Sequence, residues 1–143
     1  MSKCLSVLQP WASLIVHGMK KLETRGWRTE HRGPLLIHAG ATLTKKIVAL
    51  CQTEPFKTAL CLAGYEDPKD LPLGGIIGSA TLTGCIEACT LDDLTDVERA
   101  FGDFRLGRWA FKLSDPQPLP LMPCRGKLHV YTIDVEELCV HAA

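Results

Sequence analysis

The sequence has no excess of charge of either sign, because sixteen Lys and Arg residues balance sixteen Asp and Glu residues. Proteins that bind nucleic acid or anionic membranes regardless of sequence usually depend on a net positive charge. The balanced charge therefore argues against a global attraction to polyanions, and a site for nucleic acid must be a local patch. A pocket that recognises one base or one nucleoside is compatible with this composition.

The sequence also lacks any apolar run that approaches the roughly 18 residues of a membrane-spanning helix. Its N-terminus has no extended apolar segment of the kind found in secretory leaders. These absences predict a cytoplasmic, reducing location and no membrane association. A chain of 143 residues has the usual length of one domain, so we expect a single domain over residues 1–143 with its own hydrophobic core.

The spacing of a metal site is missing too, although the chain contains seven cysteines. The number is odd, the spacing is irregular, and Cys85 and Cys89 do not form the C-x-x-C pair of zinc and redox sites. We therefore expect mostly buried thiols, and neither a metal ion nor another cofactor. The seven are Cys4, Cys51, Cys61, Cys85, Cys89, Cys124 and Cys139.

The sequence does contain short strand patterns, separated by turns and by a few helical patterns. Helices are expected to start at Pro10, after the N-cap residue Thr44, and near Phe56, and an acidic stretch predicts a helix capped at Asp92 or Asp93. Strand patterns cover residues 4–8, 21–28, 35–39, 74–87, 108–113 and 127–133. Because there is no regular βαβ alternation, we predict an α+β fold: a small, mainly antiparallel β-barrel of five to six strands flanked by two to three helices.

The stretch from Cys4 to Arg28 brings the most candidate ligand-binding side chains together. A lysine in a partly apolar cleft loses hydration, which lowers its pKa unless a carboxylate holds it charged. Lys20 and Glu23 could form such a pair and either contact a phosphate or act as an acid/base pair. The spacing by itself also fits an exposed ion pair of little energetic value.

Arginines continue from this stretch into the following turn. Arg25, Arg28 and Arg32 lie near Trp27, and guanidinium groups bind phosphate while an aromatic ring stacks on a base. The alternative is a charged edge strand that resists aggregation. Arg125, before the last strand, could add a phosphate contact or simply form a basic hairpin tip.

The first helix and the second apolar strand supply the remaining candidates. Trp11 follows Gln9 and Pro10, a position that could place its indole at the wall of a cleft, and core packing is the alternative. His38 precedes Ala39 and Gly40, where a ligand could approach the backbone. A buried, hydrogen-bonded core histidine is the alternative there.

Residues Gly18 to Arg25, GMKKLETR, fit the signature G-x-K-x-x-E-x-R, and through them the chain resembles the ASCH domain family. Other segments resemble the family as well: CLSVLQPWASLIVHG, HRGPLLIHAG, GGIIGSATLTGC, RWAFKL and PCRGKLHVY. The resemblance implies a PUA-like fold, in which a β-barrel of five or six strands is flanked by helices and a cleft lies beside the first helix. It also implies binding of RNA or another nucleic acid.

Some small members of this family are amidohydrolases that deacetylate N4-acetylcytidine, and a ribonuclease activity has been attributed to others. Of the Lys, Thr and Glu that act in the amidohydrolases, the Lys falls on Lys20. The Thr position holds Glu23 instead, and Glu98 or Asp103 offers the last carboxylate.

Because of the departure at Glu23, and because the chain looks more like the transcription-coactivator branch, we expect binding ahead of catalysis. The expected function is binding of nucleic acid, RNA above all, or of a nucleotide or nucleoside at Lys20, Glu23 and Arg25. Metal-independent amidohydrolysis of a modified nucleoside by Lys20 and Glu23, or a ribonuclease activity, is the alternative. A protein-interaction domain that binds a peptide or small metabolite is a third interpretation.

Overall fold

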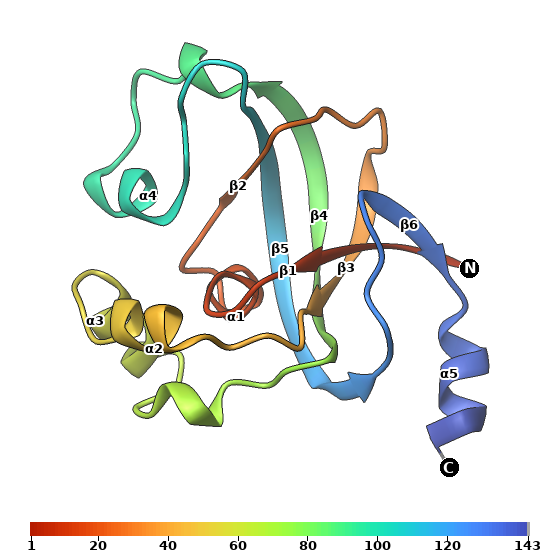
Figure 1. Ribbon diagram of the computed structural model, residues 1–143. Helices are drawn as coiled ribbons and strands as arrows, with labels where there is room; N and C mark the ends of the chain where they lie inside the picture. The colour runs from red at the N-terminus through yellow and green to blue at the C-terminus, as the bar shows by residue number, and fades with distance from the viewer. Residues whose placement is uncertain (143) are drawn as a thin grey trace.

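Strands and short helices alternate along the chain in the computed structural model, which describes residues 1–142 and the side chains of residues 1–138 (Figure 1). The strands are β1 (Ser2–Val7), β2 (Leu22–Arg25), β3 (Gly33–Ala39), β4 (Gly75–Glu87), β5 (Trp109–Pro123) and β6 (Val130–Ile133). The helices are α1 (Trp11–Val16), α2 (Lys45–Cys51), α3 (Phe56–Leu62), α4 (Asp96–Phe101) and α5 (Val135–Ala142), with 3-10 turns η1 (Pro68–Asp70) and η2 (Ala88–Thr90).

All six strands form one sheet in the order β2-β5-β4-β3-β1-β6. Neighbouring strands are antiparallel except β1 and β3, which are parallel. The α+β class and the mainly antiparallel six-stranded sheet are thus confirmed. In the described residues the sheet is not closed into a barrel by strand pairing, and five α-helices accompany it where two to three were expected. The acidic stretch for which a helix was predicted forms α4, and α5 adds a further helix after β6.

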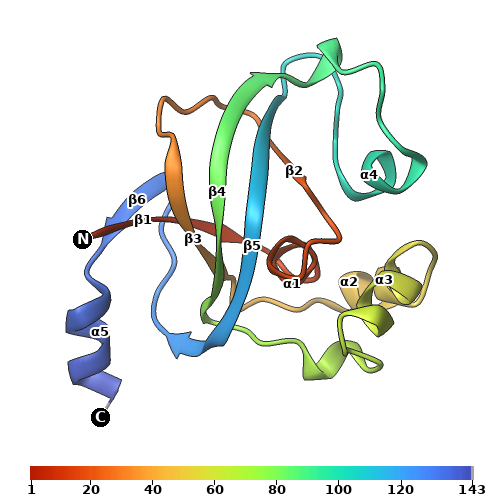
Figure 2. The same cartoon turned by 180° about the vertical axis from the view of Figure 1, so that it is seen from behind.

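Side-chain contacts bridge the two edges of this open sheet. Arg25, at the end of edge strand β2, donates from Nη2 to the carbonyl oxygen of Ser6 in β1 at 2.6 Å. The rings of Trp27 and His129, which follow β2 and precede β6, lie edge to face with their centroids 4.6 Å apart. The long strands β4 and β5 curve around α1 (Figure 2), so the edges approach each other without sharing backbone hydrogen bonds.

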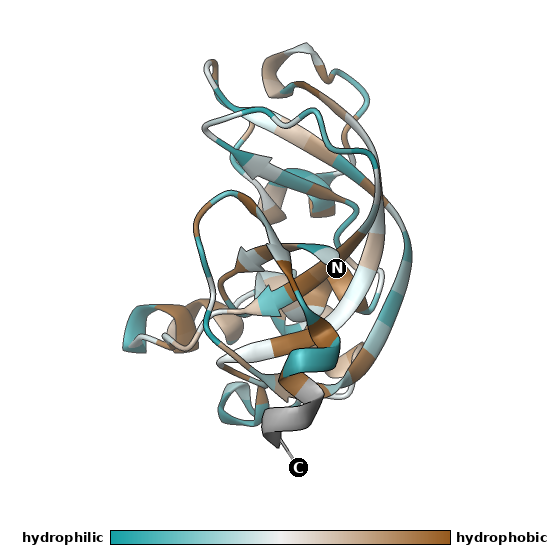
Figure 3. Cartoon of the chain, turned by 90° about the vertical axis from the view of Figure 1, so that its right-hand side faces the viewer, coloured by the Kyte–Doolittle hydropathy of each residue, from teal (hydrophilic) through white to brown (hydrophobic). Residues whose placement is uncertain are grey.

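Helix α1 packs into the concave side of the sheet and separates two hydrophobic clusters. Ile15 belongs to the larger cluster, which includes Leu82 and Phe111 of the sheet. Leu14 belongs to the second, together with Phe56 and other residues of the helical layer. Burial of apolar area on both sides of α1 stabilises this short helix. Hydrophobic residues recur along the strands, whereas much of the connecting segments is hydrophilic (Figure 3).

Close packing of α1 on the sheet requires a glycine in β4. A Cβ on Gly78 would lie 2.6 Å from Cγ1 of Val16, closer than packed carbon atoms approach. The turn after α1 needs a second glycine, because Gly18 has φ +79°, in the left-handed region that disfavours other residues. These two glycines fix the position of α1 and therefore of the chain that leads into β2.

The starts of α2 and α3 agree with the sequence, whereas the start of α4 differs. Thr44 caps α2 as expected, with its side-chain oxygen accepting from the backbone N–H of Ile47 at 3.1 Å. The expectation that Asp92 or Asp93 caps the acidic helix is wrong, because α4 starts later and Thr95 is its N-cap. Thr95 accepts from the N–H of Glu98 at 3.1 Å, the same capping geometry as Thr44.

Strand β5 extends to Pro123, well beyond the expected end at Leu113. Its partner β2 pairs only with residues 109–112, so the proline-rich second half lies at an open edge, where a missing N–H is tolerated.

In the described part of the chain, no helix combines the length and apolarity needed to cross a bilayer. The six cysteines whose side chains are described are free thiols, and Cys139 lies outside that set.

Candidate functional site

A cleft of about 600 Å³ opens where the two edges of the sheet approach each other. Its walls come from the end of β1, the start of α1, β2 with the turn that follows, and the connection between α4 and β5. Ligand sites usually have volumes of about 300–1,000 Å³, so this cleft can hold one nucleotide-sized molecule. A second cavity of about 280 Å³ lies on the other side of Lys20 and is mainly apolar.

Lys20 is almost completely buried, with 1% of its surface exposed, and lies behind the cleft. Its Nζ donates to the carbonyl oxygen of Phe101 at 2.8 Å and lies 3.8 Å from Oε1 of Glu23. Loss of hydration lowers the pKa of Lys20, and the negative charge of Glu23 opposes this shift. Lys20 therefore connects α4 to the chain that leads into β2, and its ammonium group interacts with Glu23, which lines the cleft.

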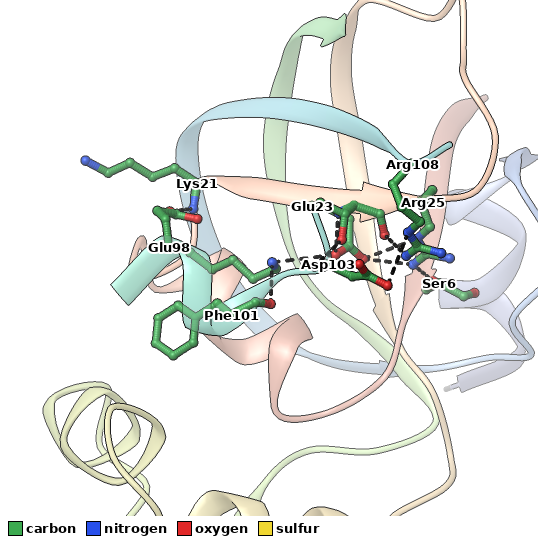
Figure 4. A network of polar contacts seen from close by, with 10 residues as sticks. Ser6, Lys21, Glu23, Arg25, Glu98, Phe101, Asp103 and Arg108 are labelled. Carbon is green, nitrogen blue, oxygen red and sulfur yellow. Dashed lines mark hydrogen bonds and ion pairs between the residues drawn. The ribbon is translucent and has the colours of Figure 1, made fainter. Parts of the chain in front are cut away.

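Glu23 is 7% exposed and lines the cleft, where it is held more closely by Arg25 than by Lys20. Its Oε2 accepts from Nε and Nη2 of Arg25 at 3.2 and 3.0 Å, and its Oε1 accepts from the N–H of Thr24 at 3.1 Å. Glu23 and Arg25 are two residues apart in a strand and so share one face. Figure 4 shows this network, which we call the ionic cluster and define as Lys20, Glu23 and Arg25.

The connection between α4 and β5 docks onto β2 through polar contacts. Asp103 donates from its N–H to Oγ1 of Thr24 at 3.0 Å, and Arg108 donates from Nη2 to the carbonyl oxygen of Thr24, also at 3.0 Å. The Asp103 carboxylate accepts from Nε and Nη2 of Arg105 at 2.8 and 2.6 Å. The hydrogen bonds from Arg105, with the charges of Arg105 and Arg108, lower the pKa of Asp103 to about 2, so this carboxylate is ionised at neutral pH.

Two tryptophans line the cleft from opposite segments of the chain. Trp11, at the start of α1, packs edge to face on Phe56, with ring centroids 6.1 Å apart. Trp27, after β2, packs on Phe111 with centroids 5.2 Å apart. Each indole is thereby fixed on one side and borders the cleft on another, as an aromatic platform for a planar ligand does.

His38 belongs to a second, separate cluster. Its ring is 2% exposed, and Nε2 donates to the carbonyl oxygen of Cys124 at 2.8 Å, so Nδ1 is left to accept from Oγ of Ser6 at 3.2 Å. Tyr131 then donates to Oγ of Ser6 at 3.0 Å and accepts from Sγ of Cys4 at 3.3 Å. We call Cys4, Ser6, His38 and Tyr131 the neutral cluster, in which every proton has an acceptor.

The remaining residues named from the sequence lie outside the cleft. Gln9 is completely buried and donates from Nε2 to Oγ of Ser13 at 2.7 Å, which fixes the start of α1 beside the buried Pro10. Arg28 is exposed, and its guanidinium lies 3.3 Å from Glu30. Arg125 is also exposed and is not among the residues that line the cleft.

The structure adds cleft residues that the sequence did not single out. Ser6, Thr24, Phe101 and Arg108 all border it. They come from three separate parts of the chain, and although Thr24 lies within the G-x-K-x-x-E-x-R stretch and Arg108 within RWAFKL, neither was assigned a role from the sequence. In the described residues, no group of three or more His, Cys, Asp or Glu side chains is arranged to hold a metal ion.

Comparison with known proteins gives a consistent family assignment. Activating signal cointegrator 1 of Mus musculus is 42% identical over 136 residues, covering 92% of this chain, and the protein of the same name from Homo sapiens is 45% identical over 85 residues, covering 58%. The matched parts are only 22% and 14% of those relatives, so the chain corresponds to a small share of their length.

Solved structures support the fold. The crystal structure of ASCH from Zymomonas mobilis has a TM-score of 0.55 and 18% identity, covering 98% of this chain and 94% of that chain. A point mutant of the same protein gives the same TM-score over 99% of this chain and 96% of that chain. The family model for the ASCH domain matches residues 5–122, which is most of the sequence. The chain therefore belongs to the ASCH domain family.

Proposed function

We propose that the cleft binds single-stranded nucleic acid, RNA in particular, or a nucleotide, by taking up one base. The observation that carries this proposal is the presence of Trp11, Trp27 and Arg25 around one cleft of about 600 Å³. An indole can stack on a base of any sequence, and a guanidinium can bind the adjoining phosphate. Membership of the ASCH family, whose resemblance implies nucleic-acid binding, supports the same function.

The charge distribution favours contact with few phosphates. The chain as a whole is neutral, and the cationic groups at the cleft are partly compensated by Glu23 and Asp103. Affinity should then come mainly from the base and only in part from phosphate neutralisation. With two phosphate contacts to a single strand, the slope of log K against log salt should be about −1.4.

The test is a titration of fluorescently labelled single-stranded RNA at two or more salt concentrations. Replacing Trp27 by Leu should weaken binding about tenfold, because base–aromatic stacking is worth about 1–3 kcal/mol per base. Trp109→Leu is the matched control, since Trp109 is partly buried against the same hydrophobic cluster but does not line the cleft. Circular dichroism would verify that both variants are folded.

Two results would contradict the proposal. If Trp27→Leu and Trp109→Leu weaken binding equally, stability rather than stacking explains the loss. If RNA shows no affinity at low salt, the proposed binding is wrong, and if it binds without salt dependence, the phosphate contact of Arg25 is wrong. A denaturing gel of the same samples would reveal any cleavage of the RNA.

A second candidate function is metal-independent amidohydrolysis of a modified nucleoside such as N4-acetylcytidine. It is favoured by the buried amine of Lys20, whose lowered pKa and position 3.8 Å from Glu23 suit an acid/base pair. Glu23 lines the cleft and Lys20 lies behind it, so a substrate would meet the carboxylate first.

Incubation with N4-acetylcytidine, followed by chromatography for cytidine, tests this second function. Turnover should be lost in Lys20→Met and in Glu23→Gln. It should persist in Lys21→Met, a control that removes the neighbouring, exposed ammonium group. Absence of turnover by the unmodified protein, or equal turnover by the Lys20 and Lys21 variants, would rule it out.

A further inference from the structure

Arg108 and Arg25 reach the same cleft from neighbouring strands. Arg25 pairs with Trp109 in the register of β2 and β5, so Arg108 lies one residue from the position opposite Arg25. Both arginines line the cleft, and Figure 4 shows them at the same end of the polar network, beside Asp103. Nη1 of Arg108 lies at the cleft wall, 3.8 Å from where a Cβ on Gly26 would be.

Both guanidinium groups have donors left over. Arg25 uses Nε and Nη2 on Glu23 and the Ser6 carbonyl, and Arg108 uses Nη2 on the Thr24 carbonyl. Neither Nη1 makes a hydrogen bond to a described residue. Nε of Arg108 is buried without a hydrogen-bond partner and lies 3.8 Å from the Asp103 carboxylate. Unpaired guanidinium donors at a cleft are strong sites for anionic oxygens.

The charged groups that line the cleft balance, so its preference for an anion depends on which donors are free. The lining holds Arg25 and Arg108 against Glu23 and Asp103. Arg105, which does not line the cleft, binds the Asp103 carboxylate at 2.8 and 2.6 Å, whereas Arg108 lies 3.8 Å from it, so the charge of Arg108 is only weakly compensated there. Behind the cleft, the charge of Lys20 is opposed by Glu23 and Glu98.

A phosphate monoester fits this arrangement better than a phosphodiester. A monoester has three terminal oxygens and close to two negative charges at neutral pH, whereas a diester within a strand has two such oxygens and one charge. The free Nη1 groups of Arg25 and Arg108 approach from neighbouring segments, so together they suit a group with several terminal oxygens. We infer that Arg108 and Arg25 form a binding site for a terminal phosphate, so that the preferred ligand is a nucleoside monophosphate or a strand end that carries a phosphate.

This inference rests on the proposed binding function, and the experiment separates the two. Calorimetric titrations would compare the four ribonucleoside 5′-monophosphates with the matching nucleosides, and a short RNA with and without a 5′-phosphate. We expect the phosphorylated ligand to bind about tenfold more tightly, because hydrogen bonds between charged groups are the strongest of their kind. Arg108→Gln should reduce this preference to less than about threefold, and Arg108→Lys should restore only part of it.

Arg99→Gln is the control, because it removes the same charge from an exposed position of α4 outside the cleft. It should leave the preference for phosphate unchanged, and circular dichroism should show all three variants folded. If RNA binds but the 5′-phosphate makes no difference, or if Arg108→Gln keeps the full preference, the terminal-phosphate site is wrong while the base pocket stands. If nucleosides, nucleotides and RNA all fail to bind, the proposed function itself is wrong.

Discussion

The ionic cluster and the neutral cluster meet at Ser6, yet they are built in opposite ways. Arg25 of the ionic cluster binds the Ser6 carbonyl oxygen, whereas His38 and Tyr131 of the neutral cluster bind the Ser6 hydroxyl. In the neutral cluster every donor has an acceptor, and Gly126 covers it so tightly that a Cβ there would lie 2.5 Å from Oγ of Ser6.

The ionic cluster borders an open cleft, where Nη1 of Arg25 and Nη1 of the neighbouring Arg108 make no hydrogen bond to a described residue. Buried polar groups that are fully hydrogen-bonded stabilise and specify a fold, while charged groups with free donors beside a cavity are equipped for a ligand. Burial and polarity alone therefore do not mark a site. His38 and Lys20 are both almost completely buried, but Lys20 pairs with Glu23, whose other partner Arg25 has a free Nη1, whereas the polar neighbours of His38 are all paired.

The largest expected effect is on stability, from Lys20→Ala in the ionic cluster. This change removes the donor to the Phe101 carbonyl and one of the cations beside Glu23. We expect a loss of about 3 kcal/mol in the free energy of unfolding, measured by urea denaturation, because the partners remain buried. Lys20→Met, which keeps the aliphatic stem, should lose less. A loss below about 1 kcal/mol for Lys20→Ala would show that the lysine is not integrated into the cluster.

The next largest effect on stability is expected from replacing a glycine beside each cluster by alanine. Gly126→Ala forces a methyl group against Ser6 and the ring of His38, and we expect about 2 kcal/mol of destabilisation in the same assay. Gly26→Ala places its methyl in ordinary contact with Arg108 at 3.8 Å, so its effect should stay within about 0.5 kcal/mol. Equal losses would remove the distinction between a closed and an open cluster.

Ser6→Ala tests the two clusters independently, because the Ser6 hydroxyl belongs to the neutral cluster and its carbonyl oxygen binds Arg25 of the ionic cluster. It leaves Tyr131 and His38 without their shared partner, which should cost about 1.5 kcal/mol of unfolding free energy. RNA affinity should not change, because Arg25 binds the backbone oxygen that alanine also provides. A clear drop in affinity at a temperature where the variant is folded would mean that the neutral cluster takes part in binding.

Alkaline pH should act on the two clusters with opposite sign, and this is the smallest effect. Burial lowers the pKa of Lys20, so the unfolded chain holds its proton longer, and this residue makes the protein more stable as pH rises toward 10.5. Burial raises the pKa of Cys4 from 9.0 to about 11 and also raises that of Tyr131, so these groups make the protein less stable as pH rises above 9.

Unfolding measured from pH 8 to pH 10 would test these signs. Compared with the unmodified protein, the free energy of unfolding of Lys20→Met should rise less with pH, and that of Cys4→Ala should fall less. Each difference should be at most about 1 kcal/mol per pH unit. Parallel pH profiles for both variants would contradict the assignment of the two clusters. The comparison is made between variants, so groups common to both cancel.

Local signals in the sequence were reliable where one residue controls the outcome. Helix α3 starts at Phe56 as expected, and Thr44 caps α2 because a side-chain oxygen can satisfy an N–H within its own turn. The cap of α4 was misplaced because Asp92, Asp93 and Thr95 all offer suitable oxygens, and the local sequence does not distinguish among them. The end of β5 was misplaced because the sequence does not show that its second half is an edge.

The sequence predicted which residues of the candidate site lie together only where they are close along the chain. Lys20, Glu23 and Arg25 lie within one turn and one strand, and alternation in β2 puts Glu23 and Arg25 on one face. Arg108 and Asp103 come from a connection far along the chain, and no local pattern predicts that it docks on Thr24. Gln9 and His38 were plausible site residues by type, and their burial follows from tertiary contacts alone.

The sequence by itself determined the start of α3, the Thr44 cap of α2 and the proximity of Lys20, Glu23 and Arg25, because these depend on the geometry of neighbouring residues. Only the tertiary structure decided that the sheet stays open, with its edges joined by the Arg25–Ser6 contact. It also decided that Arg108 enters the cleft with unpaired donors and that the hydroxyl of Ser6 faces away into a satisfied cluster. The physical reason is that hydrogen-bond partners between distant segments, and therefore which donors remain free, are set only when the chain is folded.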